Sequence, residues 1–378
     1  MRCSPALIAL ALVAAQSAHA QQEVKIGSAM PLSGPSAHLG KDTENGSRLA
    51  VEDLNAKGAT IDGKKVKWVL LAEDDAGDPK QGTAVAQKLV DAGVVGVVGH
   101  LNSGTTVPAS KIYHSAGIPQ ITPSATTPLY THQGFKSAFR VVANDYMVGG
   151  TLARYSVGTL KATRIAVIDD RTTFGQGLAD EFVKGVKNAG GAAKIVSRQF
   201  TNDKATDFNA ILTQIRAQRP EVIFFGGMDA VAGPMLKQMK ALGVDAKFVS
   251  GDGVCSDKLS VLAGDAVGED KVTCAKAGGV SGEQEAVLDA FARRFAQRFQ
   301  AQPENYSPYA YDAVMALAAA MQEAKSSDPA KYLPVLAKIR YQGVTGAIAF
   351  DPNGDLRDAA LTLYTYRNGK KTKLKVVR

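Results

Sequence analysis

The sequence predicts an α/β fold made of two similar lobes, each a doubly wound sheet of mostly parallel strands. Two observations predict it. From Val24 onward, strand patterns and helix patterns alternate in two consecutive sets, with no long linker between them. The chain of 378 residues is also longer than a single hydrophobic core usually supports. We therefore expect two domains built of βα units.

The first set of alternating elements ends near residue 121. Its strands are short apolar or β-branched runs, expected at 24–30, 66–72, 94–98 and 118–121. Its helices are expected at 42–57, 79–92 and 105–116. Asp78 and Pro79 are typical of an N-cap followed by the first helical residue.

The second set follows the segment 139–142 and leads into a largely helical last third. Its strands are expected at 165–168, 193–200, 222–225 and 248–250, and its helices at 146–160, 177–189, 207–218 and 230–242. The last third predicts helices at 284–300, 308–325 and 329–340, the second with Ser307 as its N-cap, followed by short strands. Such a tail must pack on both lobes, so the chain should cross between them more than once.

Residues 1–20 have the pattern of an export signal. Arg2 supplies the positive start, 6–15 the short apolar stretch, and 18–20 the small-x-small cleavage pattern. The stretch is too short to span a bilayer, and no later run reaches eighteen apolar residues. We expect a mature chain that starts near Gln21, lies outside the cytoplasm and does not span a membrane.

The formal net charge of +8 does not indicate nucleic-acid binding. The lysines are dispersed or alternate, as at Lys371, Lys373 and Lys375 on an expected strand, which is typical of a solvated face. No basic block is interleaved with aromatic residues. Nucleic acid is therefore not an expected partner.

Cys255 and Cys274 are the two cysteines outside the leader. In an oxidising compartment we expect them to form a disulfide, with two buried thiols as the alternative. Neither has a histidine at zinc-ligand spacing. The segment 351–362 lacks the glycine and the last acid of a calcium loop, having Leu356 and Thr362 there, and no nucleotide-binding glycine motif follows a strand. No metal or cofactor is expected.

Two hydroxyl-rich segments follow neighbouring strands of the first set. Residues 99–106 come after the strand at 94–98, and 122–127 come after the strand at 118–121. Ligands of open α/β sheets bind just beyond the carboxyl ends of the strands. Both segments therefore place hydroxyl groups and backbone N–H donors at one crevice, an arrangement that suits a carboxylate.

At this point the sequence resembles the periplasmic solute-binding proteins of ABC importers, in particular the leucine/isoleucine/valine-binding branch. The resemblance covers nearly the whole mature chain and is carried, in order, by the segments 30–35, 74–81, 99–103, 121–126, 174–177 and 350–351. It implies two lobes joined by three crossovers and closing on a ligand. The expected lobes are 21–143 with 278–347, and 144–277 with 348–378. It also implies a periplasmic monomer that delivers an amino acid to a membrane permease and is not an enzyme.

The resemblance also implies roles for individual residues. Ser103 would meet the ligand carboxylate through its hydroxyl and amide, and Thr126 would contact both the carboxylate and the ammonium. Ser124 would offer its carbonyl to the ammonium, and Asp252 would pair with the ammonium from the other lobe. Phe174 would lie over the ligand. The expected ligand-lining set is completed by Leu39, Asn102, Ala125 and Met228.

The sequence departs from the leucine-type pattern at three of these positions. Leu39 and Met228 stand where aromatic residues are expected, and Asp252 stands in place of a glutamate. The shorter carboxylate changes reach by about one bond or admits a bridging water. Two functions in the same fold stay open: an aliphatic, branched-chain-like L-amino acid as ligand, or an amide, a urea-like solute or an aromatic carboxylate.

A third hypothesis is an exported serine hydrolase with Ser103 as nucleophile. Such an enzyme needs a strained Gly-x-Ser-x-Gly elbow and a positioned histidine. The segment 100–104 lacks the elbow. These residues also have ordinary structural interpretations. Ser103 and the threonines would be helix caps, Asp252 a turn residue and His100 a structural group, and 73–75 would be a solvent-facing strand end.

Overall fold

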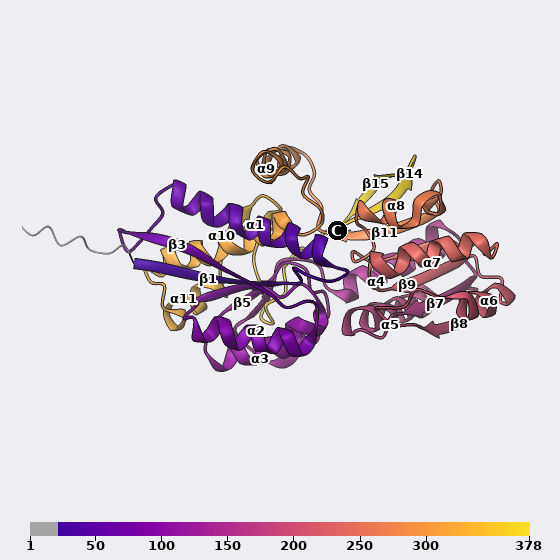
Figure 1. Ribbon diagram of the computed structural model, residues 1–378, viewed down its shortest axis with the longest axis horizontal. Helices are drawn as coiled ribbons and strands as arrows, with labels where there is room; N and C mark the ends of the chain where they lie inside the picture. The colour runs from indigo at the N-terminus through magenta and orange to yellow at the C-terminus, as the bar shows by residue number, and fades with distance from the viewer. Residues whose placement is uncertain (1–21) are drawn as a thin grey trace, which may run out of the picture.

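The computed structural model describes residues 22–378, and the expected export signal lies outside this range. The chain forms two bodies side by side, each with a central sheet between helices (Figure 1). Between residues 22 and 378, no helix combines the length and apolar character needed to cross a bilayer.

The first lobe contains a six-stranded sheet in which only β2 runs antiparallel to its neighbour. Its order is β2 (Thr60–Ile61), β3 (Lys64–Asp74), β1 (Gln22–Met30), β4 (Gly96–Gly99), β5 (Gln120–Thr122) and β6 (Ala138–Arg140). The order reverses at β1, so a crevice opens at the carboxyl ends of β1 and β4, where ligands of such sheets bind.

Helices cover both faces of the first sheet (Figure 1). One face packs on α1 (Ala37–Ala56) and α10 (Ser307–Glu323) around Trp68. The other face packs on α2 (Pro79–Asp91) and α3 (Ser103–Ser115). Asp78 is the N-cap of α2, as predicted, because its Oδ1 accepts from the amides of Lys80 and Gln81 at 2.9 and 3.0 Å. Late elements of the chain complete this lobe: α9 (Glu283–Phe299), α11 (Pro329–Leu336) and the hairpin β12 (Tyr341–Gly343) and β13 (Gly346–Ile348).

The second lobe contains a seven-stranded sheet. Its order is β15 (Lys370–Val377), β14 (Leu361–Arg367), β11 (Val272–Ala277), β10 (Lys247–Ser250), β9 (Val222–Gly226), β7 (Arg164–Asp169) and β8 (Lys194–Phe200). The five strands from β11 to β8 are parallel, and β14 and β15 are antiparallel. One face packs on α4 (Asp145–Arg154) and α5 (Thr173–Ala189), and the other on α6 (Asn209–Ala217), α7 (Asp229–Ala241) and α8 (Lys258–Ala263).

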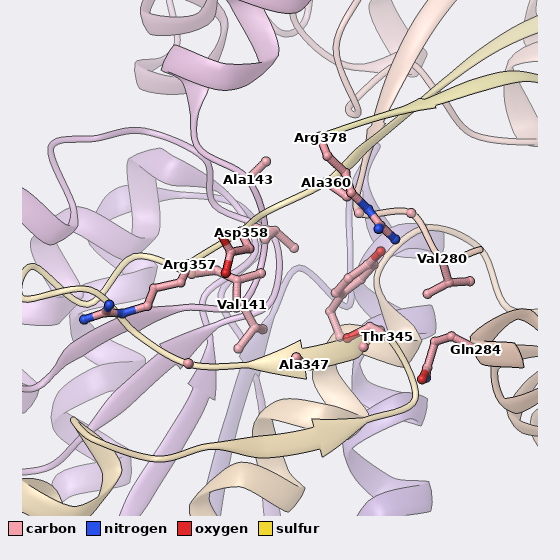
Figure 2. A pocket seen from close by; sticks show the side chains of 17 residues that line it. Val141, Ala143, Val280, Gln284, Thr345, Ala347, Arg357, Asp358, Ala360 and Arg378 are labelled. Atoms are coloured by element: carbon pink, nitrogen blue, oxygen red, sulfur yellow. The ribbon is translucent and has the colours of Figure 1, made fainter. Parts of the chain in front are cut away.

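The chain crosses between the lobes three times: from β6 to α4, from β11 to α9, and from β13 to β14. A cavity of about 270 Å³ lies among these crossovers, walled mainly by small side chains such as Ala143, Val280 and Ala347 (Figure 2). The lobe boundaries expected from the sequence stay a prediction.

Gly278 shows how tightly the second crossover is held. Its φ is +83°, and a Cβ atom at this position would lie 1.6 Å from the hydroxyl of Tyr309. That hydroxyl donates to the carbonyl of Ala277 at 2.8 Å. Only glycine combines this backbone conformation with such a close approach.

The structure differs from the expected elements in several places. Helix α1 starts at Ala37 instead of residue 42, and the helix expected at 146–160 passes after Arg154 into a single π-helical turn. Ser307 is the first residue of α10 and its side chain makes no capping bond, so its prediction as the N-cap is wrong. The strand β11 was not expected.

Candidate functional site

A cleft of about 460 Å³ opens between the two lobes. The first lobe lines it with loops that follow β1, β3 and β4, and the second with loops that follow β7, β8 and β9. Of the ligand-lining residues expected from the sequence, Asn102, Ser103, Phe174 and Met228 lie on its wall. Leu39, Ser124, Ala125, Thr126 and Asp252 are buried behind it.

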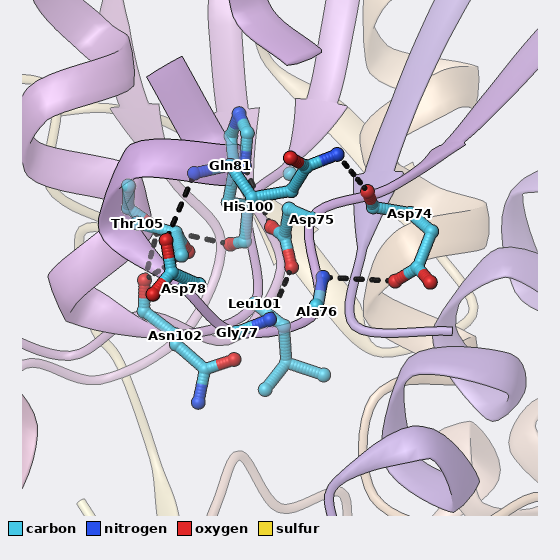
Figure 3. A network of polar contacts seen from close by, with 12 residues as sticks. Asp74, Asp75, Ala76, Gly77, Asp78, Gln81, His100, Leu101, Asn102 and Thr105 are labelled. Atoms are coloured by element: carbon cyan, nitrogen blue, oxygen red, sulfur yellow. Dashed lines mark hydrogen bonds and ion pairs between the residues drawn. The ribbon is translucent and has the colours of Figure 1, made fainter. Parts of the chain in front are cut away.

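A buried network joins two loops of the first-lobe wall (Figure 3). His100 Nδ1 lies 2.7 Å from Asp75 Oδ2, and its Nε2 lies 3.1 Å from the hydroxyl of Tyr113. Asp75 Oδ1 accepts from the amide of Gly77 at 2.9 Å. His100 is therefore a satisfied structural group, as expected. Asp75 has no exposed surface, so the interpretation of 73–75 as solvent-facing was wrong for this residue.

The N-terminus of α3 faces the cleft without a side-chain cap. Asn102 holds the N-cap position, but its side chain makes no capping bond and points away from the network in Figure 3. Asn102 Oδ1 and Ser103 Oγ are both buried and, among the described residues, have no hydrogen-bond partner. A helix N-terminus offers free N–H groups and positive partial charge, so this place suits an anionic oxygen.

The loop after β5 uses most of its polar groups to hold its own shape. Ser124 Oγ donates to the carbonyl of Leu101 at 3.0 Å, and the amide of Ala125 donates to Thr122 Oγ1 at 2.9 Å. Arg140 Nη1 donates to the carbonyl of Ala125 at 2.9 Å. The amide and the carbonyl of Ala125 are therefore each engaged in one hydrogen bond within the first lobe. Thr126 Oγ1 is buried and has no partner within residues 22–378.

Asp252, directly beyond β10, is the acidic side of the site. Its Oδ2 accepts from the hydroxyl of Tyr306 at 2.7 Å, and its carbonyl accepts from Asn305 Nδ2 at 3.0 Å. Both partners precede α10 of the first lobe. Asp252 Oδ1 has no partner in the described part of the chain. Burial raises the pKa of Asp252 to about 6, against the effect of the Tyr306 hydrogen bond.

Asp145 is a second buried carboxylate that the sequence analysis missed. It is the first residue of α4, and its amide donates to the carbonyl of Thr126 at 2.9 Å. Neither of its carboxylate oxygens has a hydrogen-bond partner among residues 22–378. Burial raises its pKa to about 7, and the charge of Asp252 adds to the rise, against the effects of the nearby Thr126 hydroxyl and of the Arg140 charge. Its signal in the sequence was an acid two residues after the apolar run 141–143, at the first crossover.

The two carboxylates therefore share one buried neighbourhood. Neither forms an ion pair among residues 22–378, although the charge of Arg140 acts on Asp145. A positive group placed there would lower both pKa values and recover the cost of burying the charges. An ammonium group has three donors, which suits carboxylate oxygens with no other partner.

The walls of the cleft are apolar next to Asp252. Phe174 is 9% exposed, and its ring and the sulfur of Met228 both lie within 3 Å of where a side chain at Gly253 would start. Met228 packs against the cores of both lobes. Leu39 has no exposed surface and belongs to the core of the first lobe, so in this closed arrangement it lies behind the wall.

The disulfide expected from the sequence is present. Cys255 and Cys274 are bonded with a Cα–Cα distance of 5.4 Å, so the alternative of two free thiols is excluded. Cys255 follows Asp252 by three residues, and Cys274 lies in β11. The disulfide therefore attaches the loop of Asp252 to the sheet of the second lobe.

The geometry around Ser103 does not provide a base for a serine hydrolase. Both ring nitrogens of His100 are occupied by Asp75 and Tyr113. No histidine in the range 22–378 hydrogen-bonds to Ser103 Oγ. In the same range, no group of three or more His, Cys, Asp or Glu side chains is placed to hold a metal ion.

The fold and the site together define a class: a two-lobed protein with a cleft between the lobes, a helix N-terminus without a side-chain cap on one lobe and a buried acid on the other. The sequence profile described as periplasmic binding protein matches residues 23–371. The chain belongs to this family.

Relatives and solved structures agree with this placement. An amino acid binding protein of Pseudomonas aeruginosa is 38% identical over 363 residues, covering 95% of this chain and 94% of the relative. Leu/Ile/Val-binding protein homolog 1 of Brucella abortus is 35% identical, covering 96% and 95%. The branched-chain amino acid transporter substrate-binding protein of Streptococcus pneumoniae, solved with isoleucine, is 26% identical, with a TM-score of 0.83 and coverage of 94% and 99%.

Proposed function

We propose that this protein is the ligand-capturing component of an ABC importer. It binds an aliphatic, branched-chain-like L-amino acid between its lobes and delivers it to a membrane permease. The names of its relatives in Brucella and the isoleucine in the streptococcal structure support this ligand class. The expected export signal supports a periplasmic location.

The observation that carries the proposal is a set of buried polar atoms in both lobes that have no hydrogen-bond partner within residues 22–378. On the first lobe these are Ser103 Oγ, Thr126 Oγ1 and Asn102 Oδ1, and on the acidic side Asp145 and Asp252 Oδ1. Buried polar groups are nearly always hydrogen-bonded, so such a cluster favours a site for a polar ligand. Hydroxyl groups and a helix end opposite two carboxylates match the two ends of a zwitterion.

In this proposal the α3 N-terminus, Ser103 and Thr126 hold the ligand carboxylate, while Asp252 and Asp145 hold its ammonium. Charge-assisted hydrogen bonds contribute about 1.5–3 kcal/mol each. The aliphatic side chain is covered by Phe174 and Met228, which contributes about 1.5–3 kcal/mol more. Micromolar binding corresponds to a net binding free energy of about −8 kcal/mol. The contacts must supply this amount and also offset the cost of ordering the ligand and closing the lobes.

Closure supplies the signal for delivery. A permease that binds the closed form better than the open form detects the loaded protein without touching the ligand. A protein with this task does not react with its ligand, so we assign no catalytic role to Ser103. A single chain contains both halves of the site, which suits a monomer.

The test is mass spectrometry of the ligand released from freshly purified protein, with a batch that was unfolded, dialysed and refolded as the control. The expected result is one or more of leucine, isoleucine and valine, lost on unfolding and recovered when these amino acids are added back. An amide, a urea-like solute or an aromatic carboxylate in place of an amino acid would contradict the proposal.

A further inference from the structure

His38 and Asp229 form a direct side-chain contact between the two lobes. His38 lies in the first turn of α1, and Asp229 is the first residue of α7. His38 Nε2 and Asp229 Oδ2 are 2.8 Å apart. The carboxylate of Asp229 has no exposed surface and the His38 side chain is 17% exposed, so water does not separate them.

Both residues are next to positions of the ligand cleft. His38 precedes Leu39, and Pro35 and Ser36, just before it, line the cleft from the first lobe. Asp229 lies between Met228 and Ala230, which line the cleft from the second lobe. The contact therefore bridges the two walls of the cleft.

Asp229 is in turn fixed to the loop that carries Asp252. Its amide donates to the carbonyl of Gly253 at 2.9 Å, and Ser256 Oγ donates to the same carboxylate oxygen that meets His38. Within residues 22–378, His38 is the one basic side chain in hydrogen-bond contact with Asp229. His38 therefore links α1 directly to Asp229, which is itself bonded to the loop that carries Asp252.

We propose that His38 and Asp229 are positioning residues that hold the cleft closed and thereby set the rate of ligand release. The contact joins elements of different lobes, so it exists in the closed arrangement and is lost when the hinge opens. Opening breaks this hydrogen bond to a carboxylate, which disfavours the open form. The inference rests on the proposed function because the ligand supplies the readout.

The first experiment measures association and dissociation of leucine by stopped-flow fluorescence for His38→Leu, His38→Gln and the wild type. The glutamine amide can place a donor near the position of Nε2. We expect His38→Leu to raise the dissociation rate about tenfold, because it removes a hydrogen bond to a charged group. The association rate should change less than about twofold. His38→Gln should recover most of the slow release.

His114→Leu is the matched control. His114 contacts Ser137 Oγ at 3.1 Å and stacks on Phe135, both within the first lobe. Its loss should leave the dissociation rate unchanged. Equal effects of His38→Leu and His114→Leu, or no rescue by glutamine, would overturn the proposal in favour of a general packing role.

A second measurement needs no ligand and separates this proposal from the proposed function. Small-angle X-ray scattering of the ligand-free protein reports the balance between closed and open forms. His38→Leu and Asp229→Asn should each shift it toward the open form, and His114→Leu should not. A wild type that binds no amino acid while these shifts occur would refute the proposed function alone. Unchanged scattering of both variants would refute the positioning pair.

Discussion

The hydroxyl of Tyr306, on the first lobe, donates a 2.7 Å hydrogen bond to the carboxylate of Asp252, on the second. This bond occupies Oδ2 and leaves Oδ1 buried without a partner. Because the donor is neutral, it orients the carboxylate without cancelling its charge. The charge therefore remains available for a ligand ammonium, and closure of the lobes itself completes the orientation of the acid.

Replacing Asp252 by asparagine should weaken amino-acid binding about 100-fold. The substitution keeps the size of the side chain and removes the charge that faces the ammonium, and truncating a buried charge pair typically costs 2–5 kcal/mol. Tyr306→Phe should cost about fivefold, since it removes one hydrogen bond that orients the same carboxylate. Isothermal titration calorimetry with leucine measures both.

Tyr130→Phe is the control for the tyrosine substitution. The hydroxyl of Tyr130 is also buried, but it donates to the carbonyl of Gln120 inside the first lobe. Its loss should lower stability and leave affinity unchanged. If Asp252→Asn bound leucine like the wild type, the acidic side of the site would lie elsewhere, with Asp145 as the next carboxylate to replace.

Ser103→Ala should lower affinity about tenfold or more without lowering the thermal stability of the ligand-free protein. The hydroxyl has no partner in the described part of the chain, so removing it breaks no internal bond, but a bond to the ligand carboxylate is lost. Ser110→Ala on the same helix provides the contrast, because Ser110 Oγ donates to the carbonyl of Val107 at 2.7 Å. A decrease in stability for Ser103→Ala equal to that for Ser110→Ala would contradict this role.

Affinity should fall as the pH falls through the range from about 7 to about 6. Burial raises the pKa of Asp145 to about 7 and that of Asp252 to about 6 in the ligand-free protein. A bound ammonium favours the charged carboxylates, so binding at pH 6 must release protons that binding at pH 8 does not. Calorimetry in two buffers of different ionisation enthalpy measures this proton release. Affinity that is independent of pH between 5.5 and 8 would contradict the assignment.

The same two groups act on the stability of the ligand-free protein in the opposite direction. Their folded-state pKa values lie above the unfolded value, so the stability they contribute is present at low pH and is lost as the pH rises through about 6 to 7. Between pH 5 and 8, the melting temperature of the ligand-free wild type should therefore fall more than that of Asp145→Asn. An equal fall in both would mean that Asp145 does not titrate in this range.

Loss of the disulfide should destabilise the protein and loosen the site. The sequence separation of Cys255 and Cys274 is 19 residues, and closing a loop of this size contributes about 3 kcal/mol in the chain-entropy model. We expect the Cys255→Ala/Cys274→Ala double variant to lose about this much in urea unfolding and to bind leucine more weakly, because Cys255 anchors the loop of Asp252. Unchanged affinity in the folded double variant would show that the loop keeps its position without the bond.

The alternation of elements was predictable because buried parallel strands and amphipathic helices leave different periodicities in the sequence. Ser103 and Phe174 were placed near a strand end on this basis, and both lie on the cleft. The N-cap of α2 was predictable because Asp78 and Pro79 carry a local signal that needs no tertiary contact. Strand β11 was missed, since its short run 272–277 contains threonine, cysteine and lysine and is buried by tertiary packing.

The polar partners of the site could not be predicted, because they come from segments distant in the sequence. Tyr306 reaches Asp252 across 54 residues, and His38 reaches Asp229 across 191. The sequence indicated that Asp75 faces solvent, whereas in the fold its carboxylate is bonded to His100. The first two pairings depend on how the two lobes meet, and the third depends on how two loops of the first lobe pack. The pattern of one sequence contains neither.

The most direct test of the central claim, that the two lobes close over a zwitterion, is calorimetry with L-leucine, N-acetyl-L-leucine and L-leucinamide. The account predicts that L-leucine binds. It also predicts that blocking the ammonium, which Asp252 and Asp145 would hold, or the carboxylate, which Ser103 would hold, abolishes measurable binding. Binding of N-acetyl-L-leucine as tight as that of L-leucine would contradict it, as would no response to any free aliphatic amino acid.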